Sequence, residues 1–448
     1  MMCKITFFFV TLHTKTEKVM RKLFLLLLAF SYIATVTAQS LKEEMKRNVN
    51  LAACNLLAYP GPTQKKLTPS PKGKKPFYIS HYGRHGSRFL NNPIEYDFVY
   101  ERMLMASQRG KLTLLGEDVL ERVRRIRENA SGRLGDLTPL GVEQHKAIAR
   151  RMYERFPEVF AGKTTIDARS TVVPRCILSM ENALQQLLLL NPKLQLRHDA
   201  SIHDMYYMNQ QDRRLAELRV DKPSRDAYEK FCTDHLTWKR VVSTLFNDMD
   251  YVEKEVNGER LNYYLFKLAA HLQNTELRNS MTLNDLFTED EILDNWRKDN
   301  VWWFLCYGAT PLSQTVQPFV QRNLLRKIIE EADSCLSLAK PGASLRYGHE
   351  TCILPLVCLL GLDGYDMVVE DVNTLEERNW WCHKIFPMGS NVQFVFYRSS
   401  PKDHDVLFKV LLNENEATLP LKPVEGPYYR WADFRDYYLR KLDSYDER

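Results

Sequence analysis

Apolar and polar positions follow the same order at three places along the chain. An extended apolar stretch leads into a polar turn at 77–88, 164–171 and 343–351, and a helical pattern follows the second and third turns. After the second turn, apolar residues recur at helical spacing, at Ile177, Met180, Leu184, Leu187 and Leu188. A further helix is predicted over 139–156. Strands that alternate with helices predict an α/β fold, here a sheet with helices on both faces.

The pattern changes between about 201 and 330, where charged and aromatic stretches of helical character, such as 213–231 and 261–274, replace the alternation. We expect this region to form a mostly helical cap that is inserted into the α/β core. The core then has a first part at 39–200, which carries the first polar turn, and a second part at 331–448, which carries the third.

The beginning of the chain has the pattern of an export signal. Arg21 and Lys22 precede the apolar stretch Leu23–Phe30, and small residues at 36–38 offer a cleavage site. We expect residues 1–38 to be an upstream extension followed by a signal peptide, and the rest of the chain to be exported to the periplasm or the extracellular space. No later apolar run reaches the ~18 residues of a membrane span, so we expect none.

Charge and cysteine content change this picture little. The formal net charge is +6, and subtracting the +4 of residues 1–38 leaves +2 for the remainder, which gives no electrostatic reason to expect a nucleic-acid partner. Of the nine cysteines, Cys3 lies in the predicted leader, and the other eight can form disulfides in an oxidising compartment. Cys352 and Cys358 equally suit buried free thiols, because they lie in an apolar helical run.

Arginines surround a histidine in the first polar turn. Arg84 and Arg88 flank His85, and Gly83 and Gly86 permit a sharp turn. Neighbouring cations oppose formation of an imidazolium, so we expect His85 to remain neutral and nucleophilic in acid. Guanidinium groups offer forked donors that match phosphate oxygens. The turn therefore predicts phosphoryl transfer with a histidine nucleophile.

The other two turns supply residues that complete such a site. An isolated R-H-G tripeptide would also fit a loop whose arginines form surface ion pairs. Arg175, however, lies at the start of the helix after the second turn, and His349 and Glu350 lie in the third turn, directly before the apolar helix expected over 352–360. The carboxyl ends of parallel strands share one edge of a sheet, so we expect the three turns to converge on one anionic group.

Together these residues resemble the histidine acid phosphatases, the large branch of the histidine phosphatase superfamily, which includes phytases and multiple inositol polyphosphate phosphatases. Members carry R-H-G-x-R near the N-terminus, here at 84–88, and H-D or H-A-E late in the chain. The similarity continues through 137–144 and 169–175 to 391–414, where it is most like the inositol polyphosphate phosphatases. It covers roughly 40–440 and implies the family's fold and a phosphatase activity.

The proton-donor position departs from both patterns of the family. His349-Glu350 stands where relatives have H-D or H-A-E. Glutamate keeps a carboxylic acid but carries it one methylene further than aspartate. A displacement of about one carbon–carbon bond is large enough to alter the rate of catalysis. The departure therefore bears on rate and substrate preference, and the family resemblance survives it.

The resemblance implies a role for each matched residue: phosphate binding by Arg84, Arg88, Arg175 and His349, nucleophilic attack by His85, and proton donation by Glu350. Water then hydrolyses the phosphohistidine, with the glutamate acting as base. No metal or other cofactor is expected, because the arginines supply the positive charge that a metal ion would bring. The expected function is a secreted phosphomonoesterase that acts on small phosphate esters, with inositol polyphosphates such as phytate as candidate substrates.

Other functions fit parts of this pattern. A phosphotransferase or mutase would share His85 and the arginines, but sugar-phosphate metabolism is intracellular and this chain carries an export signal. A non-catalytic or weakly active inositol-phosphate-binding protein of the same fold would keep the arginines and lose His85 or the acid. The lysine-rich segment 60–76 either overhangs the site, which would favour polyphosphorylated substrates, or is a solvated loop.

Overall fold

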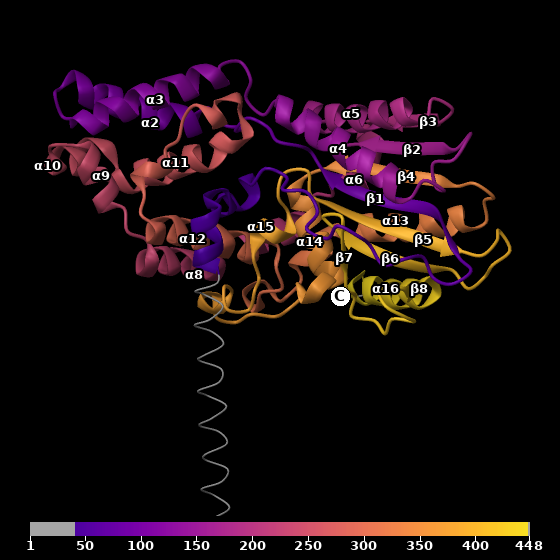
Figure 1. Ribbon diagram of the computed structural model, residues 1–448. Coiled ribbons are helices and arrows are strands. Elements are labelled where there is room, and N and C mark those ends of the chain that lie inside the picture. Colours follow the sequence, from indigo (N-terminus) through magenta and orange to yellow (C-terminus); the bar gives the residue numbers. More distant parts are fainter. Residues whose placement is uncertain (1–40, 447–448) are drawn as a thin grey trace, which may run out of the picture.

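The computed structural model describes residues 41–446, so the predicted extension and signal peptide at 1–38 lie outside the described residues. Within the described part, eight strands form one mixed sheet in the order β3-β2-β4-β1-β5-β6-β7, with β8 paired to β6 (Figure 1). The strands are β1 (Lys75–Arg84), β2 (Thr165–Ser170), β3 (Gln195–Asp199), β4 (Gly342–Gly348), β5 (Asn391–Arg398), β6 (Leu407–Leu412), β7 (Asn415–Ala417) and β8 (Tyr429–Arg430).

The strands that lead into the three polar turns are neighbours and run parallel. β4 lies between β1 and β2, with Arg84 opposite Gly348 and Ser170 opposite Tyr347. Their carboxyl ends therefore meet at one edge of the sheet, as the sequence predicted. β5 runs antiparallel to β1, so Asn391 at its start lies at the same edge.

Helices cover both faces of the sheet, which confirms the predicted fold class. On one face, Ile79 of β1 packs with the apolar sides of α4 (Pro139–Arg155) and α5 (Pro174–Leu190). On the other face, Tyr78 and Tyr82 belong to a core shared with α13 (Arg322–Leu336), α14 (Glu350–Leu360) and α16 (Trp431–Asp446). This division follows from the strand period of two, which sends successive side chains to opposite faces.

The helices expected after the polar turns begin where their sequence signals lie. The hydroxyl of Thr138 accepts from the Gly141 amide and caps α4, and Pro139 occupies its first turn. Pro174 stands in the first turn of α5. Ile148 of α4 is buried.

A helical region lies beside the sheet (Figure 1). Its helices are α2 (Ile94–Gln108), α3 (Leu114–Ala130), α7 (Arg213–Arg219), α8 (Lys222–His235), α9 (Lys239–Leu245), α10 (Met249–Tyr251), α11 (Gly258–His271) and α12 (Glu289–Tyr307), and the short α6 (Met205–Met208) leads into it from β3. The division at 39–200, 201–330 and 331–448 stays a prediction. However, α2 and α3, which come from the first of these parts, pack on α11 and α9 of the second.

Within the stretch of helical character at 213–231, the chain forms two helices, α7 and then α8. Asp221 accepts from the Ser224 amide and caps a new helix, and Pro223 lies in the first turn of that helix. Proline has no amide hydrogen to continue the bonds of the preceding helix, so α7 ends before it.

The cysteines divide between the two alternatives that the sequence left open. Cys54 and Cys382 form a disulfide that joins the 3-10 helix η1 (Val49–Leu56) to α15 (Cys382–Ile385). The free thiols of the described chain are Cys176, Cys232, Cys306, Cys335, Cys352 and Cys358. Among residues 41–446, no helix is both long enough and apolar enough to span a bilayer.

Candidate active site

The R-H-G-x-R turn leaves β1 at the edge where the parallel strands end. The amide of His85 donates to the Gly348 carbonyl at 2.9 Å, which holds the turn against the end of β4. A β-carbon on Gly86 would lie 2.5 Å from the carbonyl oxygen of Gly141. The turn can therefore approach the first turn of α4 this closely only with glycine at that position.

Ser87, the variable residue of the motif, is held from two sides. Gln144 on α4 accepts from the Ser87 amide at 2.8 Å and donates to its hydroxyl at 2.9 Å. The hydroxyl donates to Oδ1 of Asn274 at 2.6 Å. Nε2 of His271, at the end of α11, lies 2.7 Å from the carbonyl oxygen of Arg88. A carbonyl only accepts, so this nitrogen carries the hydrogen. The helical region and the sheet layer thus hold the turn together.

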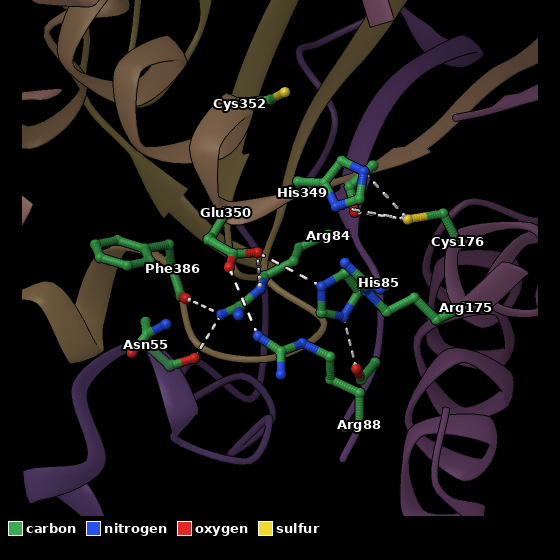
Figure 2. A network of polar contacts seen from close by, with 12 residues as sticks. Asn55, Arg84, His85, Arg88, Arg175, Cys176, His349, Glu350, Cys352 and Phe386 are labelled. Carbon is green, nitrogen blue, oxygen red and sulfur yellow. Dashed lines mark hydrogen bonds and ion pairs between the residues drawn. The ribbon is translucent and has the colours of Figure 1, made fainter. Parts of the chain in front are cut away.

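Arg84 is buried and has one end of its guanidinium held by the backbone. Nη1 donates to the carbonyl of Asn55 at 2.6 Å and to that of Phe386 at 2.8 Å (Figure 2). Nε faces the opposite way and lies 3.1 Å from Oε2 of Glu350. The side chain is 0% exposed, so its orientation is set entirely by these protein groups.

One ring nitrogen of His85 is hydrogen-bonded to the backbone, and the other has no hydrogen bond in the described structure. Nδ1 lies 2.9 Å from the Gly86 carbonyl, which can only accept, so Nδ1 carries the hydrogen. Nε2 then presents a lone pair, 3.5 Å from Oε2 of Glu350 (Figure 2). An atom with a free lone pair, fixed in direction by its own backbone, is what a nucleophilic histidine needs.

The carboxylate of Glu350 lies in the middle of the cationic groups. Besides Arg84 and His85, it faces Arg88, whose Nη2 is 4.0 Å from Oε1. Nε2 of the neutral His85 and the carboxylate oxygen of Glu350 both present lone pairs, so they do not attract each other. The carboxylate is held close to Nε2 because the guanidinium groups of Arg84 and Arg88 attract it. The carboxylate therefore marks the position that an oxygen of an incoming anion would take.

Arg175 and His349 complete the group. Arg175 extends from the first turn of α5 toward His85 (Figure 2). The ring of His349 is 5.8 Å from that of His85, centroid to centroid. Nε2 of His349 lies 3.1 Å from the Thr171 hydroxyl, and the Cys176 sulfur lies 3.7 Å from the same nitrogen. The structure thus brings together all six residues that the sequence singled out.

Several buried nitrogens around this point form no hydrogen bond in the described structure: Nε and Nη2 of Arg84, Nε2 of His85, Nε of Arg88 and Nε of Arg175. Burying donors without acceptors is unfavourable by roughly 1–3 kcal/mol each, and more for charged groups. Four of these five nitrogens belong to guanidinium groups. Such an arrangement suits a ligand with several anionic oxygens, and phosphate matches it.

The pKa values of the central groups follow from burial and from the arginines. Burial is the largest cause that lowers the pKa of His85 well below its usual range, and the charges of Arg84 and Arg88 add to it. The sequence attributed this neutrality to the arginines, which are the smaller cause. Burial alone would raise the pKa of Glu350, but the charges of Arg84 and Arg88 outweigh it and hold that pKa well below the carboxyl range. The free site thus contains a neutral histidine and an ionised carboxylate.

A metal ion is geometrically conceivable here but does not suit the charges. Ligand atoms of His85, His349 and Glu350 lie within 4.8 Å of one another. The guanidinium groups of Arg84 and Arg88 face the same space and would repel a cation. The donor set fits an anion better.

The second half of the lysine-rich segment 60–76 lies along the sheet, away from the candidate active site. Lys75 begins β1, at the end opposite to His85, and Lys74 pairs with Asp403 at 2.8 Å beside it. A ten-residue strand spans roughly 30 Å. The prediction that the segment overhangs the site is therefore wrong for Lys74 and Lys75.

Several supporting residues carried no interpretable signal in the sequence. Asn55 and Phe386 act through backbone carbonyls, which every residue has. Asn274 and His271 come from the helical region and match no motif. Gln144 belongs to the family resemblance, but only the structure shows its bonds to the turn.

Comparison with known proteins agrees with this geometry. The sequence profile of the "Histidine phosphatase superfamily (branch 2)" matches residues 83–413, about three quarters of the chain. The chain is 21% identical over 324 residues to multiple inositol polyphosphate phosphatase 1 of Gallus gallus. This alignment covers 69% of this chain and 70% of the relative.

Two solved structures share the fold. The multiple inositol polyphosphate phosphatase of Bifidobacterium longum, in complex with inositol hexasulfate, superposes with a TM-score of 0.72 at 18% identity, over 86% of this chain and 96% of that one. The phytase from D. castellii gives a TM-score of 0.65 at 14% identity, over 88% and 86% of the two chains.

Proposed function

Because the chain belongs to branch 2 of the histidine phosphatase superfamily and is a phosphatase, we propose that it hydrolyses small phosphate monoesters through a phosphohistidine formed on His85. The observation that carries this proposal is the free Nε2 of a buried, neutral His85, which points into a cluster of buried guanidinium nitrogens that form no hydrogen bond in the described structure. A nucleophile and an anion-binding site thus share one space.

In the first step, the phosphate group binds between Arg84, Arg88, Arg175 and His349. Nε2 of His85 attacks the phosphorus, a nitrogen–phosphorus bond forms, and the ester oxygen–phosphorus bond breaks. The arginines neutralise charge on the phosphoryl oxygens throughout, which is the main requirement of phosphoryl transfer.

Glu350 supplies the proton that the departing alkoxide needs. In the free site this carboxyl is ionised, because the charges of Arg84 and Arg88 hold its pKa low. A bound phosphate takes over the guanidinium groups and adds its own negative charge, so the pKa of the carboxyl rises and it can take up a proton. That proton passes to the leaving oxygen and yields the alcohol.

The second step regenerates the site. Glu350, again a carboxylate, accepts a proton from water while the water oxygen attacks the phosphorus of phospho-His85. The nitrogen–phosphorus bond breaks, phosphate leaves, and His85 returns to its neutral form. The longer reach of glutamate compared with aspartate is consistent with a donor that lies close to Nε2, at 3.5 Å in the free site.

Inositol polyphosphates such as phytate are the substrates that we propose. The proteins from Gallus gallus and Bifidobacterium longum are multiple inositol polyphosphate phosphatases, and the latter has been solved with inositol hexasulfate. The similarity of residues 391–414 to such proteins supports the same substrate class. The products formed from inositol hexakisphosphate test this assignment, and failure to release phosphate from it would contradict it.

Export to the periplasm or the extracellular space is part of the proposal. The signal-like pattern of residues 1–38 supports it, and so does the disulfide between Cys54 and Cys382, because such bonds persist in oxidising compartments. Mass determination of the N-terminus of the exported protein tests the predicted cleavage after residue 38.

Phosphate release from p-nitrophenyl phosphate at pH 4–6, with EDTA present, tests the catalytic proposal. We expect turnover that is insensitive to the chelator, and acid-labile phosphate trapped on the protein by rapid acid quenching. A protein that binds phosphate without turnover would instead support the alternative, a non-catalytic inositol-phosphate-binding protein of the same fold.

A further inference from the structure

The two carbonyls that hold Arg84 come from segments far from it in sequence. Asn55 lies in η1, 29 residues before Arg84, and Phe386 follows α15, 302 residues after it. Both accept from the same nitrogen, Nη1, at 2.6 and 2.8 Å (Figure 2). Because Nη1 is held this way, Nε and Nη2 are left to face the site, where neither has a hydrogen bond in the described structure.

The disulfide joins these same two segments. Cys54 directly precedes Asn55, and Cys382 begins the one-turn helix that ends just before Phe386. The Phe386 amide donates to the Cys382 carbonyl at 3.1 Å, so the two residues move as one unit. The covalent bond therefore spans the gap between the two acceptors, and both cysteines are fully buried.

The backbone at Cys54 needs such support. Cys54 has φ 48 and ψ −115, a left-handed conformation that is unfavourable for a residue with a side chain. This conformation redirects the chain so that the Asn55 carbonyl points at Arg84. One hydrogen bond, from the Met388 amide to the Leu57 carbonyl at 2.8 Å, also joins the two segments. Loss of the disulfide should therefore loosen the contact rather than abolish it.

We propose that Cys54 and Cys382 are positioning residues for phosphate binding: their disulfide holds the Asn55 and Phe386 carbonyls in place, and these carbonyls orient the guanidinium of Arg84 toward the phosphate. The enzymatic part of this inference rests on the proposed function. The phosphate-binding part does not, because it concerns only how an anion is held. The cross-link thereby makes full phosphate affinity depend on folding in an oxidising compartment.

A double-mutant cycle tests whether the disulfide acts through Arg84. The Cys54→Ala/Cys382→Ala pair is made in the wild type, in Arg84→Ala and in Arg88→Ala, and the inhibition constant and calorimetric affinity of inorganic vanadate are measured. In the wild type and in Arg88→Ala we expect the pair to weaken vanadate binding roughly 10- to 100-fold, because a displacement of about 1 Å at such a site has effects of this size. In Arg84→Ala we expect less than a threefold effect, because the group that the disulfide orients is gone.

A matched variant separates positioning from stability. Asn191 donates to the Phe160 and Gly162 carbonyls at the far end of α5, so Asn191→Ala breaks one buried and one partly buried hydrogen bond away from the site. We expect it to lower the melting temperature and leave vanadate affinity within twofold of wild type. If the alanine pair does not fold, Cys54→Ala/Cys382→Val replaces it in the cycle, because valine fills more of the buried space at the helical position 382 and alanine avoids a β-branched side chain at the positive φ of position 54.

The outcomes distinguish this inference from the proposed function. Equal weakening of vanadate binding in the Arg84→Ala and wild-type backgrounds would overturn the inference, and so would unchanged binding in the wild-type background. A wild-type protein that binds vanadate but releases no phosphate would overturn the proposed function alone, while the cycle still reports on Arg84. A wild-type protein that does neither would overturn both.

Discussion

Replacing Glu350 by glutamine tests the most unusual residue of the site in two independent ways. In the free structure its carboxylate lies 3.1 Å from Nε of Arg84, 3.5 Å from Nε2 of His85 and 4.0 Å from Nη2 of Arg88. A phosphate that reaches Nε2 of His85 must displace this carboxylate from the guanidinium groups. Glutamine keeps the shape, removes the competing charge, and cannot supply a proton.

The size of the effect on binding follows from the contact that the wild type has to give up. The contact is the ion pair between Nε of Arg84 and the carboxylate at 3.1 Å, and we take as its scale the roughly 1.5–3 kcal/mol of a hydrogen bond to a charged group. At 1.4 kcal/mol per tenfold change, this corresponds to roughly 10- to 100-fold. Glutamine retains part of the contact, so we expect Glu350→Gln to bind vanadate about tenfold more tightly than wild type.

Turnover should change in the opposite direction, and unequally between substrates. An alkyl phosphate needs a proton on its leaving oxygen, whereas p-nitrophenolate leaves readily without one. We expect Glu350→Gln to lower kcat for an alkyl phosphate at least tenfold more than for p-nitrophenyl phosphate. Glu350→Asp, which restores the H-D pattern of relatives, is the control and should retain the wild-type ratio between the two substrates.

Two results would refute this reasoning. Vanadate affinity equal to that of the wild type would mean that the carboxylate does not compete for Arg84. Equal slowing of both substrates would mean that Glu350 is not the proton donor. In that case its effect would be that of a negative charge at the N-terminus of α14, which is worth only about 0.3–1 kcal/mol of stability.

Four further predictions follow from the same structure. His85→Ala should fold, release no phosphate and trap no acid-labile phosphate; normal turnover would exclude this histidine as nucleophile. Arg175→Ala should lower kcat/KM roughly 30- to 1000-fold, from about 2–4 kcal/mol of lost transition-state binding, and kinetics within threefold of wild type would remove it from the site. Asn274→Ala leaves a buried hydroxyl of the motif turn without its acceptor, so urea unfolding should show a loss of about 1–3 kcal/mol, and an unchanged midpoint would contradict this. Burial lowers the pKa of His81 to about 3 and that of His145 to about 4, so the unfolded chain takes up protons first as the pH falls. Their contribution to stability should be complete above pH 6.5 and decline toward pH 4, and His145→Gln should show a smaller decline than wild type in unfolding at pH 7 and pH 5.

The sequence predicted the fold class and the convergence of the three polar turns because both depend on local signals. The three strand-turn-helix segments have clear apolar periods, and helix starts carry caps and prolines such as Thr138 and Pro174. Parallel strands place their carboxyl ends at one edge, so Arg84 and Glu350 could be expected near each other although 266 residues separate them. The sequence indicated only helical character over 213–231, and the boundary between α7 and α8 lies where Asp221 caps a new helix and Pro223 lacks the amide hydrogen to continue the old one.

By itself, the sequence determined which chemical groups the site contains: a histidine, three arginines, a second histidine and a carboxylic acid, each attached to a turn of known order in the chain. Only the tertiary structure decided how they are held. The acceptors of Arg84 are backbone carbonyls of Asn55 and Phe386, and a carbonyl is the same in every residue, so no pattern of side chains can reveal it. The pairing of Cys54 with Cys382 joins positions 328 residues apart, and proximity over such a distance results from packing of the whole chain rather than from any local period.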